Sequence, residues 1–499
     1  MNGIDTLSRR TKAILMATIG LVLLWLVITG NFAAYLALEA PETALRLRAD
    51  EPTALVILAD RWLNLGPGSN AADGARGPTP SKDDGTASRE VGDRLGGWAE
   101  IALRATVGRF ASDQAPSETQ SDPQSSPPVI SEADRRLIRS KAERALLRDP
   151  INPRALRILG QLADDAGEEV RAAKFMKAAA DLSLHESTAV YWLMRKGLTD
   201  GNFSSVAKYT DALLRQRPQL ITSVMPILVR LAENTDQHAS TELKMRLASN
   251  PPWRTSFFSR LPDFVSDART PLDLLLSLKE TPTPPTANDL APYLRFLIAR
   301  GFFDLAYYTW LQFLPPEQLT RVGLLFNSGF ESPPSGLPFD WVISPGTGVT
   351  IDMAQRADHK DDRALFLEFG PGRAEFGGVS QLLMLPPGTY KLMGKFKGEL
   401  RGRRGLQWQI ACAARDEPLA ESPMFIGVEP LWTDFDMKFS VPNADCRAQE
   451  LSLVLAARSA SEQLVSGTIW YDELRIALVA KAQSPQPPAT GLDAGPPPR

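Results

Sequence analysis

An uncharged stretch near the N-terminus constrains this chain more than any other feature. From Ala13 to Leu38 the sequence contains no charged residue, and about 20 apolar residues suffice to cross a bilayer core as a helix. Charged residues flank it on both sides: Arg9, Arg10 and Lys12 before it, Glu39 and Glu42 after it. Because basic flanks stay in the cytoplasm, the pattern predicts a transmembrane anchor at 13–38 and a cytoplasmic segment at 1–12.

A cleaved signal peptide is the alternative interpretation of this stretch. The apolar region of a signal peptide usually spans about 7–15 residues, and this one is longer, which favours an uncleaved anchor. The layout, with many alanine, arginine and proline residues, suits a bacterial protein. We therefore expect a single-pass protein of the bacterial inner membrane, with its N-terminus in the cytoplasm and its bulk in the periplasm.

The bulk composition excludes several classes of function. A chain of 499 residues allows about two to four domains. Its formal net charge of −3 gives no reason to expect a nucleic-acid partner. The three histidines are scattered, and no His-x-x-x-His or Cys-x-x-Cys pair occurs, so the spacing of a zinc site is absent.

Some segments lack the side chains that a folded core needs. Residues 39–66 have the pattern of a short helical hairpin, but residues 67–130 contain few aromatic or bulky aliphatic side chains. Such a segment is expected to be a largely disordered linker, with one short helix predicted near residues 98–110. The proline-rich tail, residues 481–499, is predicted to be disordered as well.

A repeat of 34 residues follows the linker. The positions that pair at this spacing hold small residues: Ala155 with Ala189, Gly167 with Gly201, Ala173 with Ala207 and Ala178 with Ala212. Small residues let paired helices approach closely, and glycine suits the left-handed end of a helix. The pattern resembles the tetratricopeptide repeat family, which implies a helical solenoid over residues 131–322 that binds proteins. An irregular helical bundle is the alternative.

The hydrophobic period changes after Val322. Short segments of alternating apolar and polar residues follow, bounded by Gly, Pro and Asn, such as ALFLEFG, GLQWQIACAA and WTDFDMKFSVP. Several such strands at regular spacing predict an all-β sandwich. The expected fold class is therefore multidomain: an N-terminal transmembrane helix, an α-solenoid, and a C-terminal jelly-roll β-sandwich over residues 323–480.

The order of motifs in this last segment resembles carbohydrate-binding modules with a galactose-binding-like jelly roll. NSGFE comes first, PFDW and LPPGTYKL follow, and IWYDELRI lies at the end. The resemblance implies a glycan-binding domain, because such modules stack aromatic rings on the apolar face of a sugar. Trp341 and Trp432 lie nearest to predicted loops and are the predicted glycan-binding residues, whereas Trp408 alternates with apolar residues and is assigned to the core.

The same resemblance implies a structural calcium site between the first and last strands. On that pattern Glu331 and Asp472 are the predicted ligands, with backbone carbonyl groups completing an oxygen cage. The alternative is that both are ordinary polar residues at strand ends.

The basic loop from Lys397 to Gly405 also has two interpretations, a site for an acidic polysaccharide or phosphate group and a solvated hairpin tip.

The cysteines, Cys412 and Cys446, both fall in the predicted sandwich. An oxidising periplasm permits a disulfide between them, which would close a loop of about 35 residues. A reactive thiol is not expected, because no histidine is near either cysteine in the sequence.

The motifs of common enzyme classes are absent. The sequence contains no Gly-x-Ser-x-Gly, no phosphate-binding P-loop, no Rossmann fingerprint and no His-Glu-x-x-His. We therefore expect a non-enzymatic, membrane-anchored periplasmic scaffold whose solenoid binds envelope proteins and whose sandwich binds a polysaccharide, as in exopolysaccharide export or assembly. The alternative is an envelope assembly or chaperone-like scaffold whose β-domain binds protein rather than sugar. A polysaccharide-processing enzyme is a third interpretation.

Overall fold

The computed structural model describes residues 9–65, 130–234, 237–359, 362–413, 415 and 417–481. The chain divides into two compact units, Met1–Phe257 and Phe258–Arg499, and each is described by itself. Residues 66–129 and 482–499 lie outside the described residues, together with the linker, the short helix near 98–110 and the tail that were predicted there.

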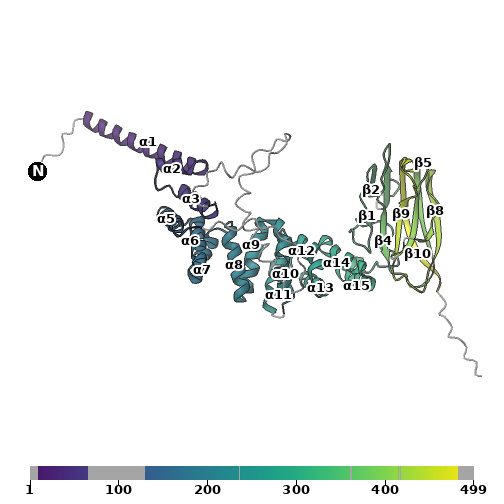
Figure 1. The fold of residues 1–499 in the computed structure, drawn as a ribbon. Coiled ribbons are helices and arrows are strands. Elements are labelled where there is room, and N and C mark those ends of the chain that lie inside the picture. The colour runs from purple at the N-terminus through teal and green to yellow at the C-terminus, as the bar shows by residue number, and fades with distance from the viewer. Residues whose placement is uncertain are drawn as a thin grey trace, which may run out of the picture. The chain divides into compact units, whose positions relative to one another are not determined.

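The first unit is built of helices (Figure 1). They are α1 (Arg9–Glu39), α2 (Pro41–Leu47), α3 (Pro52–Leu65), α5 (Glu132–Arg148), α6 (Pro153–Asp165), α7 (Glu169–Leu182), α8 (Ser187–Asp200), α9 (Phe203–Gln216), α10 (Ile221–Ala232) and α11 (Gln237–Ala248). Helix α12 (Arg254–Phe264) crosses into the second unit. A proline opens α2, α3 and α6, where its missing N–H would have no partner inside the helix anyway.

Helix α1 covers the stretch predicted to be a membrane anchor. Several of its described apolar side chains are exposed, among them Trp25, Phe32 and Leu38. Over the part of the chain that the structure describes, no helix is both long enough and apolar enough to cross a membrane. The side chains of residues 9–15, 26 and 28–30 lie outside that part, and the anchor stays a prediction.

Consecutive helices pair across tight turns. Gly167, between α6 and α7, has a φ of 75°, and Gly201, at the end of α8, has a φ of 67°; these left-handed values favour glycine. A Cβ atom at Gly160 would lie 3.0 Å from a side chain of α7, and one at Gly197 would lie 3.0 Å from a side chain of α9. The helical region is confirmed, while its assignment to the tetratricopeptide family stays a prediction.

The predicted hairpin at 39–66 belongs to the same helical stack. Leu55 and Ala59 of α3 share one buried cluster with Ile138 of α5 and with residues of α6. Buried Arg157 of α6 adds a polar link, because its guanidinium donates to Asp60 of α3 at 2.7 Å and to Glu186, the residue before α8, at 2.8 Å. A buried charge requires such partners.

The second unit begins with helices and ends in a β-sandwich (Figure 1). Its helices are α13 (Thr270–Lys279), α14 (Ala287–Ala299), α15 (Phe303–Phe313) and α16 (Pro316–Leu319). Its strands are β1 (Val342–Ile343), β2 (Val349–Gln355), β3 (Arg363–Phe369), β4 (Val379–Leu383), β5 (Gly388–Gly402), β6 (Leu406–Cys412), β7 (Pro418–Glu421), β8 (Gly427–Val441), β9 (Gln449–Leu455) and β10 (Val465–Lys481).

The strands form two antiparallel sheets, as the alternating pattern predicted. Their orders are β1-β4-β9-β6-β7 and β2-β3-β10-β5-β8. Apolar residues of both sheets meet in one core, which includes Leu365, Trp408, Leu451 and Tyr471. The predicted β-sandwich is therefore confirmed, and so is the assignment of Trp408 to its core.

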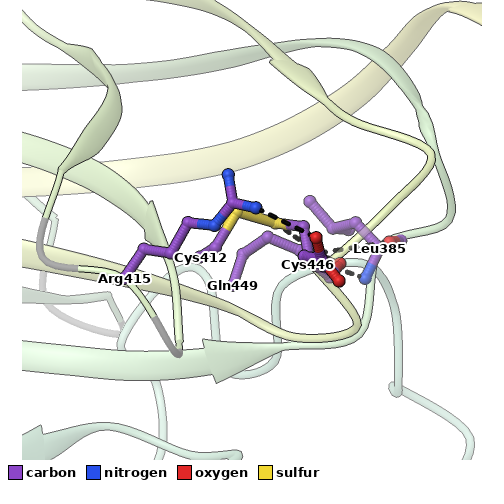
Figure 2. Close-up of a disulfide and its surroundings, with 6 residues drawn as sticks. Leu385, Cys412, Arg415, Cys446 and Gln449 are labelled. Atoms are coloured by element: carbon purple, nitrogen blue, oxygen red, sulfur yellow. Dashed lines mark hydrogen bonds and ion pairs between the residues drawn. A yellow bond between two sulfur atoms is a disulfide. The ribbon is translucent and has the colours of Figure 1, made fainter.

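A disulfide joins the end of β6 to the segment before β9 (Figure 2). It links Cys412 to Cys446, as predicted. Gln449 supports it, because its amide nitrogen donates to the Cys446 carbonyl oxygen at 2.8 Å and its amide oxygen accepts from the Leu385 N–H at 2.9 Å. The bond thus lies in a buried polar arrangement that also holds Leu385, two residues after the end of β4.

Replacing both cysteines with serine is expected to lower the free energy of unfolding of the sandwich by about 2–4 kcal/mol, because the open loop gains entropy in the unfolded chain. Denaturant unfolding of the wild type and of the double variant, each with and without reductant, measures this loss. Reductant should destabilise the wild type alone. Equal stability of the wild type and the double variant in the absence of reductant would contradict the prediction.

Candidate functional site

The outer face of the sheet β2-β3-β10-β5-β8 is the candidate functional site. Alternate residues of β3 and β10 belong to the core: Leu365, Leu367, Ile469 and Tyr471. The intervening Phe366 and Trp470 face the opposite way, since side chains alternate along a strand, and both are partly exposed. They lie directly opposite each other in the pairing of β3 with β10.

Phe366 and Trp470 form a ring pair on this face. Their ring centroids are 4.5 Å apart and their planes are inclined by 41°. In the strand register the same row continues to Asp352 on β2 and to Lys397 on β5. Side chains directly opposite on neighbouring strands lie about 5 Å apart, so a carboxylate borders the pair on one side and an ammonium group on the other.

Trp432 lies at the border of this face, at an irregularity in the pairing of β8 with β5. Its indole N–H donates to the Asp358 carboxylate at 2.9 Å. The guanidinium carbon of Arg356 and the Nζ of Lys397 lie 4.5 and 4.6 Å from its ring centroid. The ring of Trp432 is thus already engaged by two cations of the protein. Lys397 Nζ is also 5.8 Å from the ring centroid of Trp470, and it connects the two indoles.

Arg356 is the centre of a charge network beside the ring pair. Its Nη1 donates to Asp362 and to Asp472 at 2.7 Å each, and its Nε and Nη2 donate to Asp358 at 3.2 and 2.9 Å. The hydrogen bond from Arg356, followed by that from Trp432, holds the pKa of Asp358 well below its usual range. Burial raises the pKa of Asp472, which is only 2% exposed. The network fixes the end of β2 to β10.

Asp472, one of the two predicted calcium ligands, is paired with a cation of the protein. Asp472 accepts from Arg356, so the guanidinium supplies the positive charge that the resemblance assigned to calcium. Among the described residues, no group of three side chains of metal-ligating type is placed to hold a metal ion. The calcium ion stays a prediction, and a cationic side chain already compensates the buried carboxylate of Asp472.

Glu331 nevertheless lies close to two acids of this network. Its pKa is raised, first by desolvation, then by a hydrogen bond with Asp362 and by the negative charges of Asp362 and Asp472. A carboxyl group whose pKa is raised by folding binds more protons in the folded state than in the unfolded state. Its contribution to stability therefore falls as the pH rises from the ordinary pKa through the raised one.

Glu331→Gln is expected to stabilise the sandwich at neutral pH and to have little effect below pH 4.5, the ordinary pKa of the group. At neutral pH the variant removes a charge that Asp362 and Asp472 repel, and below the ordinary pKa the wild-type side chain is already protonated. Because Glu331 is exposed, the gain should not exceed about 1 kcal/mol. Thermal unfolding from acid to neutral pH measures it, with Glu450→Gln on β9 as the control. A gain that does not vary with pH would contradict the prediction.

Trp341, the other predicted glycan-binding residue, is part of the core. It is 0% exposed, its ring stacks on Phe330 at 5.1 Å, and its indole N–H donates to the Asn327 carbonyl oxygen at 2.9 Å. A sugar cannot reach this ring, so the assignment is corrected.

Sequence reasoning missed Phe366 and Trp470. The sequence ALFLEF places Phe366 between two core leucines, and this alternation could have assigned its ring to the outer face. The sequence IWYDE has no clear alternation, so it does not indicate which of Trp470 and Tyr471 faces outward.

The basic loop from Lys397 to Gly405 is a hairpin whose charges are partly neutralised. Lys397 lies 3.6 Å from Asp358, Arg401 pairs with Glu399, and Arg404 lies 3.4 Å from Glu462. This arrangement agrees with the solvated hairpin tip and gives little support to a site for acidic ligands.

Comparison with solved structures matches the C-terminal β-sandwich to carbohydrate-binding modules. One is a CBM4 module (15% identity, TM-score 0.22, 31% of this chain and 99% of that chain). Another is TmCBM61 in complex with β-1,4-galactotriose (16%, TM-score 0.21, 32% and 99%). A third is the CBM22-1 xylan-binding domain of Xyn10C from Paenibacillus barcinonensis (17%, TM-score 0.21, 31% and 94%). Comparisons with known protein families and with curated proteins give no match.

Proposed function

We propose that the sandwich binds a glycan on the outer face of the sheet β2-β3-β10-β5-β8. The ring pair of Phe366 and Trp470 carries this proposal, because two large rings lie partly exposed, side by side, on the face away from the core. The apolar face of a sugar ring stacks on aromatic side chains, and its hydroxyl groups need polar partners. Asp352, Thr468 and Lys397 are polar residues of this face beside the rings.

Affinity electrophoresis tests the proposal. The full-length protein is run through native gels that contain one neutral polysaccharide each, over several linkages, or no polymer. Because α1 exposes apolar side chains, the buffer contains a detergent without a sugar head group. Retardation in at least one polysaccharide gel supports glycan binding. Free migration in all of them would rule it out.

The wider role that we propose is a non-enzymatic scaffold. Its helical unit would bind envelope proteins while the sandwich binds a polysaccharide during exopolysaccharide export or assembly at the bacterial inner membrane. Stacked helix pairs support the first part, since such repeats present extended surfaces to partners. The uncharged stretch at 13–38 supports the location. Alkaline extraction of membranes tests it: an anchored chain stays in the pellet, and release into the supernatant would contradict the anchor.

A β-domain that binds protein is the second candidate, and the edge strand β8 favours it. This strand ends its sheet, and its first half exposes Val428 by 62% and Leu431 by 76%. Exposed apolar residues on an unpaired edge are typical of protein contacts. Val428→Thr with Leu431→Ser should abolish partner capture under this alternative and leave glycan retardation unchanged under the first proposal.

A further inference from the structure

We infer that this face selects glycans with free amino groups over polymers of uronic acids. The inference rests on the proposed glycan function and specifies its ligand class. It comes from the charges around the ring pair of Phe366 and Trp470, which are distributed unevenly between its two sides.

The basic side chains of β5 on this face are already compensated by acids, whereas Arg475 of β10 and Lys438 of β8, farther along the face, have no carboxylate within 4 Å among the described residues. The compensated pairs of β5 are Lys391 with Asp436 at 3.3 Å, Lys395 with Glu473 at 2.8 Å, Lys397 with Asp358 at 3.6 Å, and Arg401 with Glu399. Arg356 is compensated in the same way by its three aspartates. A uronate carboxylate would therefore have to compete with a carboxylate of the protein for each of these compensated cations.

The acidic side chains on the β2–β3 side are in a different situation. Asp352 lies opposite Phe366 on β2, and Glu368 lies two residues beyond Phe366 on β3, on the same face and opposite Thr468. Both are exposed. Within the described ranges neither carboxylate has a lysine, arginine or histidine nitrogen within 4 Å. The ring pair is thus bordered by two uncompensated negative charges.

A ligand that stacks on the rings must meet these two charges. An ammonium group of an amino sugar would gain an ion pair at Asp352 or Glu368, and a uronate carboxylate would be repelled there. Exposed pairs are weak individually, and two of them correspond to roughly a tenfold difference in affinity. Since salt screens exposed charges, the preference should shrink as the ionic strength rises.

Isothermal titration calorimetry on the full-length protein tests the inference. The probes are three oligosaccharides of equal length and the same β-1,4 linkage: cello-, chitosan and glucuronan oligomers. If gel retardation favours another polysaccharide backbone, oligomers of that backbone are used in three forms: unmodified, aminated, and oxidised at C6 to the uronate. The aminated or chitosan form is expected to bind about tenfold more tightly than the neutral form, and the uronate form more weakly than either.

Variants distinguish a local effect from attraction by the whole acidic protein. Asp352→Asn with Glu368→Gln should bring the affinity ratio of cationic to neutral ligand from about ten to about one. Glu450→Gln, an exposed acid on β9 of the other sheet, should leave that ratio unchanged. An unchanged ratio in the double variant, or equal wild-type affinities for neutral and cationic forms, would overturn the inference while glycan binding stands. Failure to bind any form would overturn both proposals.

Discussion

Trp470→Ala is expected to weaken glycan binding about 30-fold, the largest loss that we expect from one substitution on this face. The indole is half of the proposed stacking surface, and a central aromatic residue of a binding surface is commonly worth about 2 kcal/mol. The measurement is the polysaccharide concentration that halves mobility in the affinity gel. Trp470→Phe should keep part of the affinity because it keeps an aromatic ring at the position.

The control for this experiment is Tyr308→Ala, which removes an aromatic side chain that is 62% exposed on α15. It should not change the retardation. Unfolding curves of Trp470→Ala establish that the sandwich is folded when it is assayed. Unchanged retardation of a folded Trp470→Ala protein would show that Phe366 and Trp470 are not the stacking surface, and the edge strand β8 would then become the stronger candidate site.

Arg356→Met is expected to lower the free energy of unfolding of the sandwich by about 3–5 kcal/mol at neutral pH. The substitution leaves Asp472, which is 2% exposed, without its cation, and an uncompensated buried charge carries a penalty of that size. The loss should diminish at acid pH, because protonation of Asp472 removes the unpaired charge. Denaturant unfolding measures it, with hydrogen exchange in β10 peptides identifying the transition of the sandwich.

Two further variants separate this electrostatic effect from a loss of packing. Arg373→Met removes a cation of an exposed pair with Glu375 and should change stability by less than about 1 kcal/mol. Asp472→Asn in the Arg356→Met background should recover much of the loss, because the buried charge itself is gone. A double variant that is no more stable than Arg356→Met alone would show that the penalty comes from packing against Trp432.

The sandwich could be predicted from the sequence because its strands alternate in an ordinary way. In GLQWQIAC the period of two places Trp408 among core residues, and the structure has it 0% exposed. The disulfide was also predictable, since Cys412 and Cys446 had no other cysteine to pair with. The helical stack could be predicted from glycines and alanines at fixed spacing, whose reason is local: the turn at Gly201 needs a left-handed residue.

The site residues were harder to predict than the sandwich, because the solvent exposure of their side chains is decided by segments far apart in the chain. Trp341 follows a loop-like segment, yet that segment folds into the core and buries it. Trp432 lies at the border of the candidate face, yet its ring is covered by two cations from distant segments. These are Arg356, which follows β2, and Lys397 of β5. Asp472 has the position that a calcium ligand would have, but Arg356, 116 residues earlier, compensates it.

The sequence by itself determined the order of helical and β segments, the sandwich class and the pairing of the cysteines, because hydrophobic periods and turn residues act over a few neighbours. Only the tertiary structure decided which aromatic rings face solvent and which acidic side chains pair with a basic side chain of the protein. Those properties depend on strand register, which sets Phe366 beside Trp470 and Asp352 beside Phe366, and register arises from the packing of the whole sheet on its core.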